Sequence, residues 1–313
     1  MWIRRQGPTV EIHVPAKVNL FLEILAKRPD GFHELETLIA AIGVCDTLIC
    51  EPLASDEIIV DCRWAAGCQA VGSAIARRTA SDLYGPLPVL QDNLVWKAAR
   101  RLQERSPAKL GARVVVHKRI PAAAGLGGAS ADAAATLVGL NLVWQLGLSR
   151  DSLAEIAAEL GSDVPFFLRG GVAVCRGRGE LVEPTPRLPP LSVTVARPPE
   201  GLGTPQVYRR CQVSAEPRSS APIVAAWARG DQRGIGEGMK NQLQPPAAEL
   251  SPWIGCLEQR TEGIGAIAKQ MSGSGTSYFA IGRHARHARR MAGTLRAAGL
   301  GAVFSTRMPT GGE

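Results

Sequence analysis

The sequence lacks the features that most easily identify membrane, secreted and nucleic-acid-binding proteins. No part of its 313 residues approaches the roughly 18 uninterrupted apolar residues of a membrane span, and the first residues lack the apolar core of a signal peptide. Aromatic residues make up only 5% of the chain, and none interrupts the basic run 283–299, so a base-stacking surface is not supported. We therefore expect a cytoplasmic protein with neither a membrane nor a nucleic-acid partner.

Cysteine is present, but not in a metal-binding or disulfide pattern. The seven cysteines are odd in number and include no Cys-x-x-Cys pair, which indicates reduced thiols in a cytosolic protein. Cys62 and Cys68 flank a short loop without accompanying histidines, and we predict no metal ligands. The net charge of +8 suits an anionic partner such as a nucleotide or a phosphorylated metabolite, although the arginines are scattered.

The first part of the chain alternates predicted strands and helices, which is typical of an α/β fold. The turn at 28–31 has the proline, aspartate and glycine of a hairpin connection. Asp92 or Asn93 caps one predicted helix, Ser149 caps another, and Gly161 ends the latter. The predicted strands are 11–27, 32–44, 57–61, 112–120, 172–175 and 180–182, and the predicted helices are 94–105, from the glycine-rich loop to about 146, and 151–160.

A proline-rich segment, 184–191, is the best candidate for a linker, because clustered prolines neither extend a helix nor pair in a central strand. It divides the chain into predicted domains of residues 1–185 and 186–313. In the second, smaller domain we expect strands at 192–196 and 277–281, and helices at 222–229, 251–259 and 286–298.

A glycine-rich loop between a predicted strand and a predicted helix carries the clearest chemical signal. Its residues are Pro121, Ala122, Ala123, Ala124, Gly125, Leu126, Gly127, Gly128, Ala129 and Ser130. The glycines let the backbone approach a ligand, and unpaired amides at the helix start attract an anion. A tight packing turn is the alternative, but the long alanine-rich helix that follows favours phosphate. No lysine lies between Arg119 and Ser149, which excludes a Walker loop, and the helix runs on through Trp144, which excludes a Rossmann fingerprint.

Three ordered motifs together resemble those of the GHMP kinases. The loop at 121–130 is similar to the second signature of that family, PAKVNLFL at 15–22 to the first, and MSGSGT at 271–276 to the third. The resemblance implies a two-domain α/β (α+β) fold, with an N-terminal nucleotide-binding domain containing a left-handed βαβ-type unit and a smaller C-terminal ferredoxin-like domain. It also implies ATP with Mg²⁺, and a small-molecule acceptor.

Two further segments narrow the acceptor. Residues 30–38, DGFHELETL, and 161–167, GSDVPFF, resemble the branch of the family that phosphorylates the 2-hydroxyl of a methylerythritol linked to cytidine diphosphate, in the non-mevalonate route to isoprenoids. Family members that act on homoserine, mevalonate or a sugar are not expected to combine PAKVNLFLEI with DGFHELETL. A catalytically silent nucleotide-binding homologue is not expected to keep both Lys17 and Asp163.

Lys17 and Asp163 are the predicted catalytic residues. Phosphoryl transfer needs positioning, charge neutralisation and a group that accepts the hydroxyl proton, and Asp163, after a helix end and before a Val-Pro step, suits the last role. Lys17 can keep Asp163 ionised and orient the hydroxyl, and matching residues have these roles in the resembled family. A surface ion pair is the commoner fate of either residue, but the motifs favour catalysis. Asn19 shares one strand face with Lys17, and we expect it to contact the substrate or the phosphates.

Recognition of cytosine should need stacking faces and a polar group at the base edge. The resemblance assigns stacking to Phe32 and Tyr208 and the base edge to His33, whereas a core position for Phe32 and a solvated turn position for His33 are the alternatives. The remaining predicted binding residues are Thr204, Gly273 and Ser274 for the acceptor and Asn93 near the adenosine.

The predicted phosphate loop has fewer glycines than its relatives. Ala123, Ala124 and Ala129 stand where glycine is common, and Ala131 stands where a second serine is. If one of these positions requires a positive φ, the alanine methyl costs about 1 kcal/mol. Such a cost would weaken nucleotide affinity without removing activity. For the oligomeric state we expect a monomer or a weak homodimer.

Overall fold

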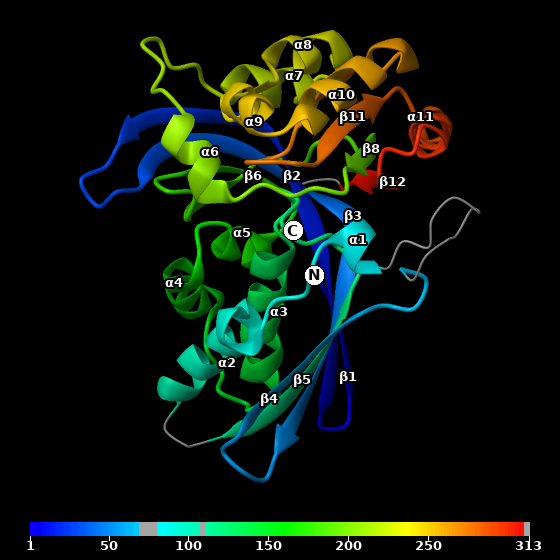
Figure 1. The fold of residues 1–313 in the computed structure, drawn as a ribbon. Coiled ribbons are helices and arrows are strands. Elements are labelled where there is room, and N and C mark those ends of the chain that lie inside the picture. Colours follow the sequence, from blue (N-terminus) through cyan, green and yellow to red (C-terminus); the bar gives the residue numbers. More distant parts are fainter. Residues whose placement is uncertain (69–79, 107–109, 310–313) are drawn as a thin grey trace.

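Two long antiparallel strands, β2 (Thr9–Lys27) and β3 (His33–Leu53), form the central element of the protein. The computed structural model describes residues 1–68, 80–106 and 110–309. In Figure 1 both strands run from the lower unit of the molecule to the upper unit. Residues 10–15 of β2 alternate between buried and half-buried, whereas 16–24 are all buried. The change follows from packing, because a helix covers one face of this stretch and the second unit contacts the other.

The first sheet has the strand order β1-β2-β3-β5-β4, with β6 beside β3, β7 beside β6 and β9 beside β2. Strands β4 (Ile58–Trp64) and β5 (Gly111–Lys118) are parallel neighbours, and α2 lies between them in the chain, so they form a βαβ unit. The other strands are β1 (Trp2–Gln6), β6 (Val172–Arg176), β7 (Leu181–Pro184) and β9 (Lys240–Asn241).

Helices cover one face of this sheet, and side-chain caps fix where two of them begin. The Asn93 side chain accepts a hydrogen bond from the amide of Val95 at 2.9 Å, and that of Ser149 accepts one from the amide of Ser152 at 3.1 Å, as the capping pattern predicts. The helices of the first unit are α1 (Ala80–Tyr84), η1 (Leu90–Asp92), α2 (Leu94–Glu104), α3 (Gly128–Val143), α4 (Arg150–Leu160) and α5 (Val164–Arg169).

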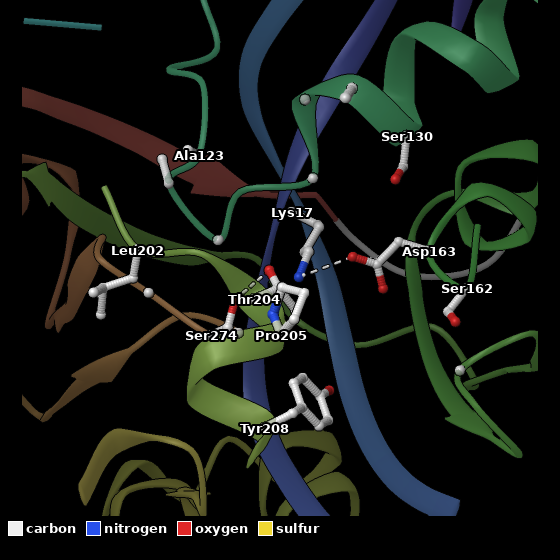
Figure 2. Close-up of a pocket in the computed structure, with 18 of the residues that line it drawn as sticks. Lys17, Ala123, Ser130, Ser162, Asp163, Leu202, Thr204, Pro205, Tyr208 and Ser274 are labelled. Atoms are coloured by element: carbon white, nitrogen blue, oxygen red, sulfur yellow. Dashed lines mark hydrogen bonds and ion pairs between the residues drawn. The ribbon is translucent and has the colours of Figure 1, made fainter. Parts of the chain in front are cut away.

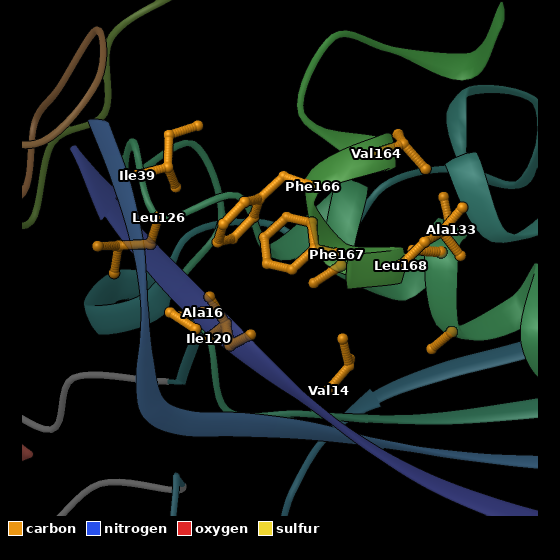
Figure 3. Close-up of a cluster of buried hydrophobic side chains, with 14 of the residues drawn as sticks. Val14, Ala16, Ile39, Ile120, Leu126, Ala133, Val164, Phe166, Phe167 and Leu168 are labelled. Carbon is orange, nitrogen blue, oxygen red and sulfur yellow. The ribbon is translucent and has the colours of Figure 1, made fainter. Parts of the chain in front are cut away.

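The core under these helices fixes α5 and the loop before α3. Phe166 and Phe167 are fully buried, with ring centroids 5.2 Å apart in an edge-to-face arrangement. Figure 3 shows both rings projecting from α5 toward the strands, near Ala16 and Leu126. The alanines of α3 let it lie close to the sheet, and a Cβ atom added at Gly139 would come within 2.6 Å of the Cys50 sulfur.

The second unit is built on an antiparallel sheet with the order β10-β11-β8-β12. Its strands are β8 (Leu191–Arg197), β10 (Ala268–Met271), β11 (Tyr278–Gly282) and β12 (Ala302–Met308). Taken in chain order this is 2-3-1-4, the arrangement of a ferredoxin-like sheet, as the resemblance implied. Its helices are α6 (Thr204–Arg210), α7 (Ala221–Ala228), α8 (Gln232–Gly238), α9 (Gln244–Leu250), α10 (Pro252–Arg260), η2 (Glu262–Ile264) and α11 (Ala285–Ala297).

Most predicted elements exist, but several run further and others had no sequence signal. Strand β3 continues nine residues past its predicted end at Val44, because a register shift between Pro15 and Ala16 of β2 preserves the pairing across the break in alternation. Strands β1, β10 and β12 and helices α5, α6, α8 and α9 were not predicted. Helix α8 contains three glycines, so packing rather than propensity must hold it.

The chain leaves the first sheet at Pro184 and enters the second at Leu191, within the predicted linker. The domain bounds 1–185 and 186–313 remain a proposal, because β9 returns from the second half of the chain to pair with β2. Between the predicted strand 57–61 and the predicted helix 94–105, residues 69–79 lie outside the described part of the chain. Among the helices that are described, none is both long and apolar enough to cross a membrane.

Candidate active site

Lys17 is the centre of a polar cluster on β2. Its side chain is 5% exposed, and its ammonium group donates a hydrogen bond to Oδ1 of Asn19 at 2.7 Å and lies 3.2 Å from Oδ2 of Asp163. Figure 2 shows the Lys17 side chain pointing across the cavity to Asp163. The predicted common strand face of Lys17 and Asn19 is therefore confirmed, and Asp163 joins them although it is far away in the sequence.

The amide of Asn19 is fixed by a chain of hydrogen bonds. Its Nδ2 donates to Oγ1 of Thr37 at 2.9 Å, and that hydroxyl donates in turn to the carbonyl oxygen of Phe21 at 2.6 Å. Asn19 Oδ1 is thus left to accept from Lys17. Thr37 on β3 was missed in the sequence, where it stands in the predicted strand 32–44 without any sign that its hydroxyl serves this site.

Asp163 lies between two helices, and its carboxylate is not used to cap either of them. It follows α4 and occupies the residue before α5, but its side chain does not cap that helix. Pro165 occupies the first turn of α5, where its missing amide hydrogen costs nothing. The carboxylate is 32% exposed, so one oxygen meets Lys17 while the group stays open to the cavity. This combination suits a base that must reach a substrate proton.

The loop at 121–130 connects β5 to the N-terminus of α3, as predicted. Gly127 precedes α3 with φ of 71°, and its left-handed conformation opens the first amides of that helix to a ligand. Gly125 must also be glycine, because an added Cβ would lie 2.1 Å from the carbonyl oxygen of Ser272. The conditional expectation about the alanines is met at one position: Ala123 has φ of 48°.

The third motif holds this loop from the second unit. Ser272 donates from its hydroxyl to the carbonyl oxygen of Gly125 at 2.9 Å. The amide of Ser277, the residue after the motif, donates to the carbonyl oxygen of Ala124 at 3.1 Å. On the other side, the amide of Lys17 donates to the carbonyl oxygen of Leu126 at 3.0 Å. All three family-like motifs therefore meet at this one loop.

A buried network of ion pairs lies where β5 leads into the loop and stabilises the start of the loop. The ammonium group of Lys118, the last residue of β5, bonds the carboxylates of Asp46 and Asp132, the latter at 2.6 Å. Asp46 also accepts from the amide of Ile120 at 2.8 Å. These residues had been missed, since a lysine or an acid in a strand or helix is ordinarily a surface residue.

A cavity of about 980 Å³ joins these groups between the two units. Every predicted site residue lines it except Leu126, whose side chain is buried in the core and whose carbonyl oxygen binds Lys17. Asn93 lines it while capping α2. Lining residues that the sequence did not reveal include Pro86, Leu87, Pro88, Ser162, Arg178, Leu202 and Arg209.

The end of the cavity away from the loop is aromatic. The His33 and Tyr208 rings lie 5.4 Å apart at 43°, and Tyr208 faces the cavity from α6 (Figure 2). Burial, followed by the charge of Lys27, lowers the pKa of His33, so its imidazole is neutral near pH 7. Phe32 is half exposed, and the guanidinium carbon of Arg178 lies 4.8 Å from its ring centroid. Neither the core position for Phe32 nor the simple turn position for His33 fits.

Two hydroxyls and one asparagine organise the region between the aromatic end and Lys17. Thr204 and Ser274 lie 2.8 Å apart, oxygen to oxygen, as Figure 2 shows. The side chain of Asn241, which the sequence did not point to, donates to the carbonyl oxygens of Met271 and Gly273 at 2.8 Å each. It thereby fixes the turn that carries Gly273 and Ser274.

No group of three or more histidine, cysteine, aspartate or glutamate side chains suited to a metal ion occurs within 1–68, 80–106 and 110–309. All seven cysteines are free thiols. Ser130 and Asp163 both line the cavity and carry side-chain oxygens, but two such residues are too few for a cage built from protein ligands alone.

Comparison with known families agrees with the three motifs. Residues 93–171 match the model described as GHMP kinases N terminal domain, and residues 223–300 match GHMP kinases C terminal. The two matches fall in the first and second structural units respectively.

Full-length relatives carry a more specific name. A 4-diphosphocytidyl-2-C-methyl-D-erythritol kinase of Listeria monocytogenes serotype 4a is 36% identical over 288 residues, which cover 92% of each chain. The kinase of the same name from Pelotomaculum thermopropionicum is 38% identical over 90% of this chain and 92% of its own.

Solved structures extend the similarity to three dimensions. A crystal structure of 4-(cytidine 5'-diphospho)-2C-methyl-D-erythritol kinase matches with a TM-score of 0.75 and 33% identity, covering 97% of this chain and 100% of the other. A homoserine kinase from Cytophaga hutchinsonii matches with a TM-score of 0.72 but only 19% identity, over 99% of this chain and 98% of its own, which shows the shared fold alone.

Proposed function

The chain belongs to the GHMP kinase family, and from this premise we propose that it transfers the γ-phosphoryl group of ATP to the 2-hydroxyl of 4-diphosphocytidyl-2-C-methyl-D-erythritol. The observation that carries the proposal is the position of the Lys17–Asp163 pair. It stands in one cavity between the glycine-rich loop on one side and an aromatic pocket on the other. A phosphoryl donor and a cytidine-bearing acceptor can therefore meet at this pair.

Asp163 acts as the base in this proposal. The 2-hydroxyl loses its proton to the carboxylate while its oxygen attacks the γ-phosphorus, and the bond from that phosphorus to the bridging oxygen of ADP breaks. Lys17 lies between Asp163 and Asn19, so its charge stands beside the attacking oxygen and the transferred group. Amides at the start of α3 neutralise charge on the phosphates.

Asn19 keeps Lys17 in this position. Because Thr37 occupies the nitrogen of the Asn19 amide, its oxygen is the end presented to the ammonium group. The lysine can then turn only its remaining hydrogens to Asp163 and to the substrates. Replacing Asn19 would disorder the ammonium group without removing its charge.

The aromatic pocket supports cytidine as the recognised group. The half-buried ring of Tyr208 and the exposed ring of Phe32 offer flat faces for a pyrimidine, and neutral His33 offers one donor and one acceptor to its edge. Thr204, Gly273 and Ser274 lie between this pocket and Lys17, where the acceptor's diphosphate and polyol would pass. Asn93, Pro86 and Pro88 would contact the adenosine, at the end of the cavity opposite the aromatic pocket.

Mg²⁺ accompanies ATP in this proposal and neutralises part of the polyphosphate charge when bound. Ser130 and Asp163 are the side chains whose oxygens could reach it. We keep the cytoplasm as the proposed location and a monomer or weak homodimer as the proposed assembly.

The test is to incubate the purified chain with Mg-ATP and 4-diphosphocytidyl-2-C-methyl-D-erythritol and to examine the product by ³¹P NMR and mass spectrometry. We expect ADP and a phosphomonoester on the 2-oxygen in equal amounts. Homoserine and mevalonate serve as parallel acceptors. Phosphorylation of either of these, with no product from the cytidine compound, would overturn the acceptor assignment, and ATP binding without any transfer would favour the silent homologue.

A further inference from the structure

Arg197, the last residue of β8, is a buried cation outside the catalytic cluster. It is 1% exposed, and among the described residues no carboxylate lies within ion-pair distance of it. Burial lowers the pKa of its guanidinium group, with no neighbouring charge in opposition. Burying a charge without a counter-ion is costly, so this arginine is not explained as an ordinary core residue of the second unit.

The guanidinium group ties together three separate segments. Its Nη1 donates to the carbonyl oxygens of Leu83 and Pro199, both at 3.0 Å, and its Nη2 donates to that of Ala122 at 3.3 Å. Leu83 lies in α1 and Ala122 in the phosphate loop. The amide of Ala122 in turn donates to the carbonyl oxygen of Tyr84 at 2.7 Å. The start of the loop is thus bonded on both its donor and its acceptor side.

Two glycines lie close against this contact. A Cβ atom at Gly85 would lie 3.0 Å from Nη2 of Arg197 and 3.1 Å from the carbonyl oxygen of Ala122. One at Gly201 would lie 2.8 Å from the carbonyl oxygen of Ala123. Arg197 and Gly85 therefore lie against Ala122, and Gly201 lies against Ala123, the residue of the loop that adopts a positive φ without being glycine.

The phosphate loop also separates Arg197 from the nucleotide. Ala123 lines the main cavity and also a second cavity of about 680 Å³, and Arg197 lines the second one. The Nε atom of Arg197 is buried and has no hydrogen-bond partner among the residues that the structure describes. Within the described part of the chain, this positive charge has no counter-ion. It stands behind the wall against which the polyphosphate would lie, and its field favours an anion on the other side.

We propose that Arg197 is a positioning residue for the phosphate loop, which holds Ala122 and Ala123 in the shape that binds the polyphosphate of ATP and adds a favourable charge behind it. This inference rests on one part of the proposed function, the binding of ATP, and does not depend on the identity of the acceptor. It makes the second unit a direct determinant of nucleotide affinity, although the loop belongs to the first.

Isothermal titration calorimetry with Mg-ATP, and separately with adenosine, tests the proposed role of Arg197 without any acceptor. Hydrogen bonds from a charged donor support an expected loss of about 10-fold or more in Mg-ATP affinity for Arg197→Met, with adenosine affinity unchanged. Arg197→Lys, which keeps the charge but not the fork of donors, should lose less. Arg307→Met, an exposed arginine on neighbouring β12, is the matched control and should bind Mg-ATP as the native chain does.

Equal affinities of native, Arg197→Met and Arg197→Lys chains for Mg-ATP would overturn the proposal. So would a parallel loss for ATP and adenosine, because a merely structural role would not single out the phosphates. If Arg197→Met does not fold, Arg197→Lys decides: unchanged Mg-ATP affinity contradicts the proposal, and a selective loss supports it. A chain that binds ATP in this way but leaves the cytidine acceptor unphosphorylated would refute the proposed acceptor and leave the role of Arg197 standing.

Discussion

The catalytic pair and the phosphate loop lie in one cavity, yet they are held in place by different means. Lys17 and Asn19 are two residues apart on a long strand that is buried throughout residues 16–24, so the strand period alone brings them together. The loop at 121–130 instead depends on contacts from distant parts of the chain, including Ser272, Ser277 and Arg197 of the second unit. Lys17 and Asn19 are therefore positioned by one strand, whereas the phosphate loop, and with it nucleotide affinity, depends on both units.

Among the variants that test this comparison, Asp163→Asn should have the largest effect on turnover. Removing the base should lower kcat by about 10²- to 10⁴-fold, while the KM values for both substrates change little, since the neutral amide has the same shape. Steady-state kinetics at saturating Mg-ATP measure this. Asp151→Asn, at an exposed position paired with Arg169, is the matched control and should leave kcat unchanged. Turnover at the native rate in Asp163→Asn would remove Asp163 as the base.

A smaller and more selective effect is expected at the aromatic end, with Tyr208→Ala. Stacking of a base on an aromatic ring contributes about 1–3 kcal/mol, so KM for the cytidine acceptor should rise by about 5- to 100-fold and KM for ATP should not. Burial raises the pKa of Tyr208, so the phenol is neutral, and Tyr208→Phe should behave like the native chain. An equal rise in both KM values would contradict a division of the cavity into two binding ends.

The smallest expected effect concerns the strain in the phosphate loop. Ala123 has φ of 48°, and Ala123→Gly should raise the free energy of unfolding by up to about 1 kcal/mol. Ala129→Gly, in the first turn of α3 and also exposed, should lower it by up to about 1 kcal/mol. Urea denaturation of both variants compares the signs directly. If neither variant or both variants were more stable than the native chain, strain from the positive φ at Ala123 would be contradicted.

The two regions also differ in how well the sequence predicted them. The strand pattern and the signature motifs were enough to place Lys17, Asn19 and the phosphate loop on their elements, and the ordering of the motifs indicated the fold. Asp163 was identified by its motif, but nothing in the residues alone showed that it would lie 3.2 Å from Lys17. That distance depends on how α5 packs its two phenylalanines into the core.

The groups that sequence reasoning missed share one property. Thr37, Asn241, Arg178 and Arg197 act through contacts with residues remote in the chain, and none stands in a pattern that distinguishes it from an ordinary strand, turn or surface residue. Short elements such as α6 and α9 were missed for the same reason, because tertiary packing rather than local propensity stabilises them. Long-range packing is thus the information that a single sequence does not reveal.

The most direct test of the whole account is the ratio of kcat/KM for the cytidine-bearing acceptor to that for the same acceptor lacking its cytidylyl group. If one cavity joins the aromatic pocket to the Lys17–Asp163 pair, loss of the stacking contacts and of the hydrogen bonds at the base edge should lower kcat/KM by about 10²-fold or more. Tyr208→Ala should shrink this ratio. Equal kcat/KM values for the two acceptors would contradict the account, because the aromatic end would then have no part in the reaction.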